Sequence, residues 1–189
     1  MTMNVTTNFN NAVPLARSYW VVPGKLLAGY YPGDISVVER ERKLRGLLLV
    51  GIRFTINLME EAERNWYGDP FAPYHLHIKQ YAQEMDMEIT CVRRPIRDMH
   101  IPTHEEMETI LDEIDFVIEN KKPVYIHCLG GKGRTGTVVG CYLMRHGIAT
   151  KSTVLPMIQN LRRRDPEFSS PSLESTVQRH MVMNWKQGE

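Results

Sequence analysis

Residues 124–147 constrain the fold more than any other part of the chain. The run VYIHC is short and mostly apolar, a glycine-rich loop follows, and the next stretch is apolar nearly all round. This order predicts a buried strand, a tight loop and a buried helix. Glycine permits a tightly curled backbone, and the N–H groups at a helix N-terminus attract negative charge. The segment therefore predicts an anion site between a strand and a helix.

Strand and helix patterns alternate along most of the chain. Period-two alternation and short apolar runs predict strands at 25–29, 52–58, 87–92 and 124–128. Helical spacing and start signals predict helices at 36–51, 103–118, 134–146, 152–164 and 172–186. This alternation indicates an α/β fold, a single domain with a central, mostly parallel sheet flanked by helices.

Segment 59–82 has no clear pattern. Aromatic residues such as Trp66, Phe71 and Tyr74 lie among glycine, aspartate and proline, with weak helical character from Tyr74. We expect an irregular segment anchored by these aromatic side chains. The alternative is an insertion that forms one wall of a binding site.

Composition narrows the class of protein. The chain has 189 residues, a formal net charge of +1 and three cysteines. Its length suggests one domain, which we place at 18–189 after a polar, flexible tail at 1–17. The near-neutral charge gives no reason to expect a nucleic-acid partner, and we find no apolar run long enough for a membrane span or a secretory signal. The odd number of cysteines argues against a disulfide framework and predicts a cytoplasmic location.

Two kinds of nucleotide-binding loop match the glycine-rich segment only in part. A nucleotide-triphosphate loop needs Gly at 126 and Ser or Thr at 133, where this chain has Ile126 and Gly133. Gly131, Gly133 and Gly136 match the spacing of a dinucleotide-binding loop, but the acidic residue expected further along is missing. We reject both interpretations.

Cys128 and Arg134 stand at the two ends of the loop. Five residues separate them, so the loop can enclose one tetrahedral anion with the sulfur below it and the guanidinium beside it. Backbone N–H groups and the helix dipole favour a thiolate, and arginine can bind two phosphoryl oxygens at once. The pair predicts nucleophilic attack on a phosphomonoester through a cysteinyl-phosphate.

The motif His127-Cys128-x-x-Gly130-x-x-Arg134-Thr135-Gly136 resembles the phosphate loop of cysteine-based protein tyrosine phosphatases. Residues 95–103, 26–33 and 172–178 are similar to the general-acid loop, the opening strand and turn, and the last helix of the small atypical dual-specificity branch. The resemblance implies the fold of that branch, phosphomonoester hydrolysis, and no metal or other cofactor.

Together, these patterns assign roles to individual residues. Cys128 is the expected nucleophile, Arg134 the expected ligand of the phosphate, and Asp98 the expected general acid and base. His100 and Asp86 are weaker candidates for the role of Asp98.

Other residues are expected around the loop. Thr135 would donate its hydroxyl to the thiolate, and His127 would brace the loop through hydrogen bonds. The resemblance of the last helix to that of the family implies that Gln178 lies near the site. The substrate phosphate would be bound by the loop itself, namely Leu129, Gly130, Gly131, Lys132, Gly133 and Arg134.

We expect phosphotyrosine in proteins as the substrate, with phosphoserine and phosphothreonine as further targets. Lys132 matches in position a lysine of the superfamily's best-known phosphoinositide phosphatase, so a phosphoinositide or inositol phosphate is the alternative. A non-catalytic phosphate-binding module is a second alternative. The sequence leaves the oligomeric state open.

A metal site and a disulfide have weaker support from the sequence. His75 and His77 have no other ligand at metal-binding spacing, so no metal is expected there. Cys91 remains a candidate partner for an oxidised Cys128, whereas Cys141 lies about 20 Å along the helix and is a poor one.

Overall fold

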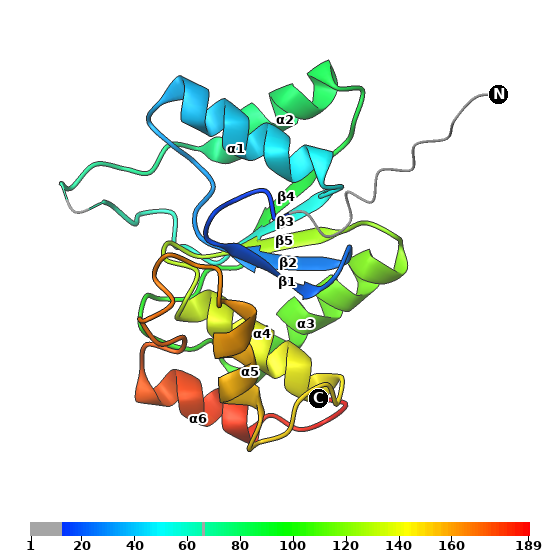
Figure 1. Ribbon diagram of the computed structural model, residues 1–189, viewed down its shortest axis with the longest axis vertical. Helices are drawn as coiled ribbons and strands as arrows, with labels where there is room; N and C mark the ends of the chain where they lie inside the picture. The colour runs from blue at the N-terminus through cyan, green and yellow to red at the C-terminus, as the bar shows by residue number, and fades with distance from the viewer. Residues whose placement is uncertain (1–12, 66) are drawn as a thin grey trace.

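The computed structural model describes residues 13–65 and 67–189, which form three layers with a sheet between two groups of helices (Figure 1). The strands are β1 (Ser18–Val22), β2 (Leu26–Gly29), β3 (Phe54–Asn57), β4 (Thr90–Arg93) and β5 (Val124–His127). The helices are α1 (Val37–Leu49), α2 (Tyr74–Glu84), α3 (His104–Glu119), α4 (Arg134–Arg145), α5 (Val154–Leu161) and α6 (Thr176–Asn184). α1 and α2 cover one face of the sheet, and the other four helices cover the opposite face.

The sheet has the strand order β1-β2-β5-β3-β4. β1 runs antiparallel to β2 at one edge, and the other three pairs are parallel. β5 lies between β2 and β3 and is buried at every position. Because ligands bind beyond the carboxyl ends of parallel strands, the loop that follows β5 is placed at the natural site of the fold.

Successive residues of β5 enter different cores. Val124 and Ile126 pack with the layer of α3 to α6, whereas Tyr125 packs with α1 and α2. Burial on both faces explains why the strand is almost wholly apolar. The expected α/β domain with a central, mostly parallel sheet is confirmed.

α4 is the most buried helix of its layer. All residues from Arg134 to Met144 are buried. Gly140 permits the close approach of α6, because a Cβ at this position would lie 2.6 Å from Cγ1 of Val182. The apolar pattern of 134–146 therefore predicts the environment of this helix correctly.

The N-terminal part of the chain differs from the expectation. Residues 1–12 of the expected tail lie outside the described residues, but Leu15 is 1% exposed in the core under α1, while Val13 is exposed. β1 is also absent from the expected strands, although Tyr19, Trp20 and Val21 are typical of strands. β1 pairs with β2 across a tight turn in which Gly24 has a φ of 69°.

Some of the observed helix bounds differ from the expected ones by a few residues. α2 begins at Tyr74, where the weak helical character was expected to begin, whereas α5 and α6 are shorter than the expected 152–164 and 172–186. Among the described residues, no helix has both the length and the apolar character that crossing a membrane requires.

Candidate active site

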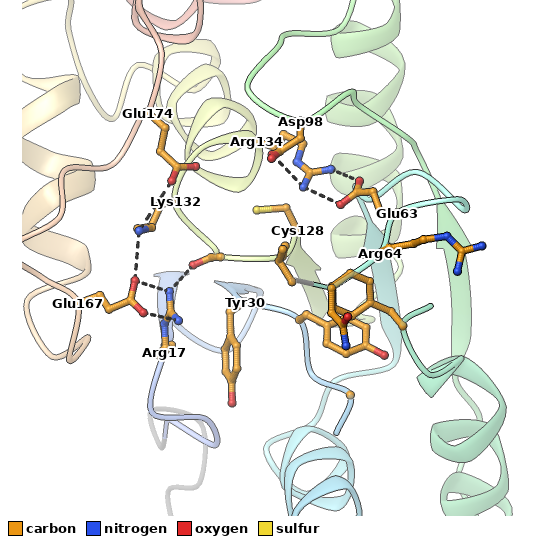
Figure 2. A pocket seen from close by; sticks show the side chains of 16 residues that line it. Arg17, Tyr30, Glu63, Arg64, Asp98, Cys128, Lys132, Arg134, Glu167 and Glu174 are labelled. Carbon is orange, nitrogen blue, oxygen red and sulfur yellow. Dashed lines mark hydrogen bonds and ion pairs between the residues drawn. The ribbon is translucent and has the colours of Figure 1, made fainter. Parts of the chain in front are cut away.

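Residues 128–134, named here the phosphate loop, connect β5 to α4, and all of them except Gly131 and Gly133 line a pocket (Figure 2). Cys128 follows β5 directly and is 3% exposed. Its Sγ accepts a hydrogen bond from the backbone N–H of Gly131, with a distance of 3.3 Å between nitrogen and sulfur. This hydrogen bond ties the sulfur to the curled backbone of the loop.

Gly131 occupies the tightest position of the phosphate loop. Its φ is 72°, a left-handed conformation that side chains disfavour. A Cβ there would also lie 2.7 Å from the backbone carbonyl carbon of Gly29 in β2. Glycine is therefore required at this position for two separate reasons.

Arg134 is the first residue of α4, and its side chain is 1% exposed. Nη1 donates to the Ile96 carbonyl at 3.1 Å, and Nη2 donates to Oε2 of Glu63 at 3.1 Å. Nη2 also lies 3.0 Å from Oδ1 of Asp98. Nε is buried without a hydrogen-bond partner among the described residues, which is uncommon for a buried donor. The guanidinium is thus fixed along one edge and keeps a donor available for a substrate oxygen.

Glu63 is a site residue that the sequence patterns do not reveal. Its carboxylate pairs with both terminal nitrogens of Arg134. Nothing in the sequence distinguishes it from the other glutamates of segment 59–82. Other residues of the segment also line the pocket, namely Arg64, Asn65 and Phe71. The segment therefore forms one wall of the site, which was the alternative interpretation.

Asp98 is the candidate general acid that the structure places in the pocket. Its side chain is 62% exposed and pairs with Arg134. His100 is not among the residues that line the pocket, and its ring bonds to the Asp98 backbone carbonyl at 2.8 Å. Asp86 lines a separate cavity. The geometry therefore brings Asp98 together with Cys128 and Arg134 and leaves the two weaker candidates outside.

His127 lies fully buried beneath the phosphate loop. Burial lowers its pKa to about 3, so the ring is neutral. With the proton on Nδ1, the neutral ring donates to the Cys128 carbonyl at 3.1 Å and accepts at Nε2 from the Tyr74 hydroxyl at 2.7 Å. The hydrogen bonds that brace the loop are present, as the sequence analysis expects.

Thr135 differs from its expected role. Its hydroxyl donates to the Gly29 carbonyl at 3.4 Å, and no bond to Sγ of Cys128 is found in the described part of the chain. The residue is fully buried, and β2 offers the acceptor within reach. In this structure Thr135 links α4 to β2.

Gln178 connects three segments near the pocket. Its side-chain oxygen accepts from the backbone N–H groups of Glu174 and Ser175 at 2.9 and 3.2 Å. Its side-chain nitrogen donates to the His100 carbonyl at 3.2 Å. A Cβ on Gly133 would lie 3.2 Å from that nitrogen. Gln178 thus holds the general-acid loop against α6, next to the phosphate loop.

Lys132 does not present an unpaired charge. Its Nζ donates to Oγ of Ser170 at 3.0 Å and lies 3.1 Å from Oε2 of Glu167 and 3.7 Å from Oε1 of Glu174. The extra cation expected beside the phosphate loop is present, but two carboxylates compensate its charge.

The pocket has a volume of about 720 Å³, and Tyr30, Tyr31 and Phe71 give it aromatic sides.

Neither Cys91 nor Cys141 lines the pocket, and burial raises the pKa of both thiols. A disulfide between Cys91 and Cys128 remains a prediction. Within 13–65 and 67–189, no three His, Cys, Asp or Glu side chains gather as a metal site.

Comparison with protein families gives one match over most of the chain. A family model described as polymorphic toxin system, DSP-PTPase phosphatase, matches residues 35–148. The matched span contains Asp98, Cys128 and Arg134, and also Glu63. It does not reach Arg17 or Gln178.

Curated relatives match shorter regions. A putative tyrosine phosphatase of Invertebrate iridescent virus 3 is 28% identical over 131 residues, which cover 67% of this chain and 45% of that protein. An uncharacterized protein of Methanocaldococcus jannaschii is 40% identical over 65 residues, covering 34% of this chain and 44% of that protein. The chain therefore spans less than half the length of these relatives.

Solved structures share the fold. Tk-PTP in its active form superposes with a TM-score of 0.66 at 22% identity, covering 90% of this chain and 96% of that chain. The core catalytic domain of the PP-IP phosphatase SIW14 from S. cerevisiae, in complex with citrate, gives 0.60 at 19% identity, covering 93% and 88%. At these identities the likeness establishes the fold alone.

Proposed function

The chain belongs to the DSP-PTPase phosphatase family of polymorphic toxin systems, and from this membership we propose that it hydrolyses phosphotyrosine in proteins through a cysteinyl-phosphate. Phosphoserine and phosphothreonine are proposed as further targets. The observation that carries the proposal is the placement of Cys128, Arg134 and Asp98 around one pocket.

Binding of the phosphate group follows from the loop geometry. The backbone N–H groups at the start of α4 and the guanidinium of Arg134 surround the position above Sγ of Cys128. The buried Nε of Arg134 has no partner among the described residues, so a phosphoryl oxygen would satisfy it. These donors would also stabilise the charge that the three equatorial oxygens share in the transition state.

In the first step, the thiolate of Cys128 attacks phosphorus and the bond between phosphorus and the ester oxygen breaks. The carboxylic acid of Asp98 gives its proton to the leaving oxygen, which departs as a neutral alcohol. The phosphoryl group is then bound to sulfur.

In the second step, a water molecule attacks phosphorus and the bond to sulfur breaks. The Asp98 carboxylate accepts a proton from this water, which regenerates the acid. The thiolate returns to the hydrogen bond from the Gly131 N–H, and inorganic phosphate leaves. The cycle uses no residue outside the pocket as a proton donor.

The sides of the pocket support an aromatic substrate. Tyr30, Tyr31 and Phe71 line the space above the phosphate loop, and offset or edge contacts with a phenyl ring are favourable. Small phosphoserine side chains would leave these surfaces without contact. This difference is the reason for placing phosphotyrosine first.

A phosphoinositide or inositol phosphate is the second candidate substrate. Lys132 and Arg17 supply cations near the phosphate loop that a single phosphate group does not need. The non-catalytic phosphate-binding module is less well supported, because nucleophile, acid and arginine are all present in one pocket.

The substrate class is tested with two peptides of the same flanking sequence, one carrying phosphotyrosine and the other phosphoserine. In buffer containing EDTA, we expect kcat/KM to be at least about tenfold higher for the phosphotyrosine peptide. Cys128→Ser should abolish both activities. Equal rates on the two peptides would contradict the tyrosine preference, and phosphate binding without any turnover would favour the non-catalytic module.

A further inference from the structure

Two cations in the wall of the pocket share one carboxylate. Arg17 precedes β1 and Lys132 belongs to the phosphate loop, yet both contact Glu167 (Figure 2). Nη1 of Arg17 lies 2.7 Å from Oε1, Nη2 of Arg17 donates to Oε2 at 3.0 Å, and Nζ of Lys132 lies 3.1 Å from Oε2. All three side chains line the pocket. A carboxylate bound in this way marks a place where a phosphate group would be bound by the same donors.

The depth of this cation pair limits which anion can reach it. Nη2 of Arg17 also donates to the Gly130 carbonyl at 2.8 Å, so the guanidinium rests on the phosphate loop itself. The side chains of Arg17 and Lys132 are only 22% and 15% exposed. A phosphotyrosine would hold its peptide backbone a ring's length above the loop. A second phosphate on the same small ring as the scissile phosphate would meet the cations at the level of the loop.

Glu167 is the member of this network that can leave. Its side chain is 45% exposed, whereas Asp165, which lies 3.5 Å from Arg17, is 6% exposed and is paired with Arg162 at 2.9 Å. The backbone N–H of Glu167 donates to Oδ1 of Asp165 at 2.9 Å. Because partly exposed ion pairs are weak, the Glu167 side chain can turn into solvent while its backbone and Asp165 stay in place.

We propose that Arg17 and Lys132 form a second anion subsite for the non-scissile phosphate of a compact, polyphosphorylated ring such as an inositol phosphate. Glu167 fills this subsite and is displaced when such a substrate binds. The inference rests on the proposed phosphatase function of the pocket and develops the second candidate substrate class named above. Glu167 thereby acts as an internal competitor that a substrate with one phosphate never has to displace.

The subsite is tested by calorimetry on the full chain carrying Cys128→Ser, with inositol 4,5-bisphosphate, whose phosphates are on neighbouring carbons, and inositol 4-phosphate as probes. Glu167→Gln removes one negative charge at nearly constant size. We expect it to lower the Kd of the bisphosphate by roughly three- to tenfold and that of the monophosphate by less than about twofold. Adding Arg17→Met should reverse the gain for the bisphosphate.

Glu41→Gln is the matched control. Glu41 is also 45% exposed and also lies 2.7 Å from an arginine, Arg45, but on α1 and outside the pocket. It should leave the ratio of the two Kd values unchanged. The same substitution on the two carboxylates thus separates an effect of the subsite from a general effect of net charge.

Two results would overturn the proposal. An unchanged Kd ratio in Glu167→Gln, or a gain that survives Arg17→Met, would show that the network only braces the loop before α6. Tighter binding of a doubly phosphorylated peptide, without a gain for the bisphosphate, would refute the assignment to a compact ring. Turnover of p-nitrophenyl phosphate by the chain with Cys128 intact tests the phosphatase function separately.

Discussion

Arg134 and Asp98 form an ion pair, with 3.0 Å between Nη2 and Oδ1. The proposed general acid, Asp98, is therefore bound to the residue that is proposed to bind the phosphate. An incoming phosphate has to displace the Asp98 carboxylate from the guanidinium of Arg134. Glu63 contacts both terminal nitrogens of the same guanidinium, Nη2 included, and is less exposed than Asp98, at 15% against 62%. This asymmetry suggests that Asp98 yields to the substrate while Glu63 stays.

Replacement of Asp98 should affect substrates according to their leaving groups. Asp98→Asn keeps the shape of the side chain but cannot give a proton, so we expect kcat on phenyl phosphate to fall by about 10²- to 10⁴-fold. The loss on p-nitrophenyl phosphate should be smaller, because nitrophenolate departs without protonation. Equal losses on the two substrates would show that Asp98 acts by binding and not as the acid.

Replacement of Glu63 should disturb the position of Arg134. Glu63→Gln keeps one hydrogen bond but removes the charge that faces a buried guanidinium, and we expect a loss of about 1–3 kcal/mol in the free energy of unfolding. KM for p-nitrophenyl phosphate should rise about tenfold, because the arginine loses one of its fixed contacts. Urea unfolding and steady-state kinetics measure the two effects. Glu61→Gln, at an exposed position nearby, should change neither.

Gly131 and Gly68 provide a matched pair for the phosphate loop. Both have positive φ, 72° and 84°, but a Cβ meets the backbone of β2 at Gly131 and has nothing within 4 Å at Gly68. Gly68→Ala should cost about 1 kcal/mol through backbone strain alone. Gly131→Ala should cost several kcal/mol more, or abolish turnover through displacement of the loop. Similar unfolding free energies for the two variants would contradict the close packing of the loop on β2.

The buried His127 should make stability depend on pH. Burial holds its pKa at about 3 in the folded chain, below the value of 6.5 expected in the unfolded chain. The unfolded chain therefore binds the proton more readily, so the stability present above pH 6.5 is lost as the pH falls toward 3. Between pH 7 and pH 5 this loss should be about 2 kcal/mol.

Urea unfolding at both pH values, for the unmodified chain and for His127→Gln, measures this contribution. Between pH 7 and pH 5, the unfolding free energy of His127→Gln should fall by about 2 kcal/mol less than that of the unmodified chain. An identical drop in both proteins would show that His127 is not the group that titrates.

The parts of the fold that follow local patterns could be predicted from the sequence. The strand before Cys128 is a short apolar run, the helix after Gly133 is apolar nearly all round, and the phosphate loop joins them with glycines. β1 could not be predicted from its pattern, because Tyr19, Trp20 and Val21 are consecutive apolar residues without period-two alternation. Its stability as a strand comes from pairing with β2, a contact that local pattern does not specify.

The parts of the site that depend on distant contacts could not be predicted. Glu63 contacts a residue 71 positions away, and Arg17 contacts Gly130 across 113 positions. The Thr135 hydroxyl donates to the Gly29 carbonyl because the sheet places that residue of β2 beside α4. Such pairs follow from strand order and loop packing, and no spacing within the sequence encodes them.

The central claim is that Cys128 carries the phosphoryl group during turnover. Asp98→Ala mixed with p-nitrophenyl phosphate and quenched in acid should accumulate this intermediate, because its hydrolysis lacks the general base. Mass spectrometry of the peptide that contains Cys128 should then show one added phosphoryl group, and Cys128→Ser should show none. Turnover with no phosphoryl group on Cys128, or with the group on another residue, would contradict the account.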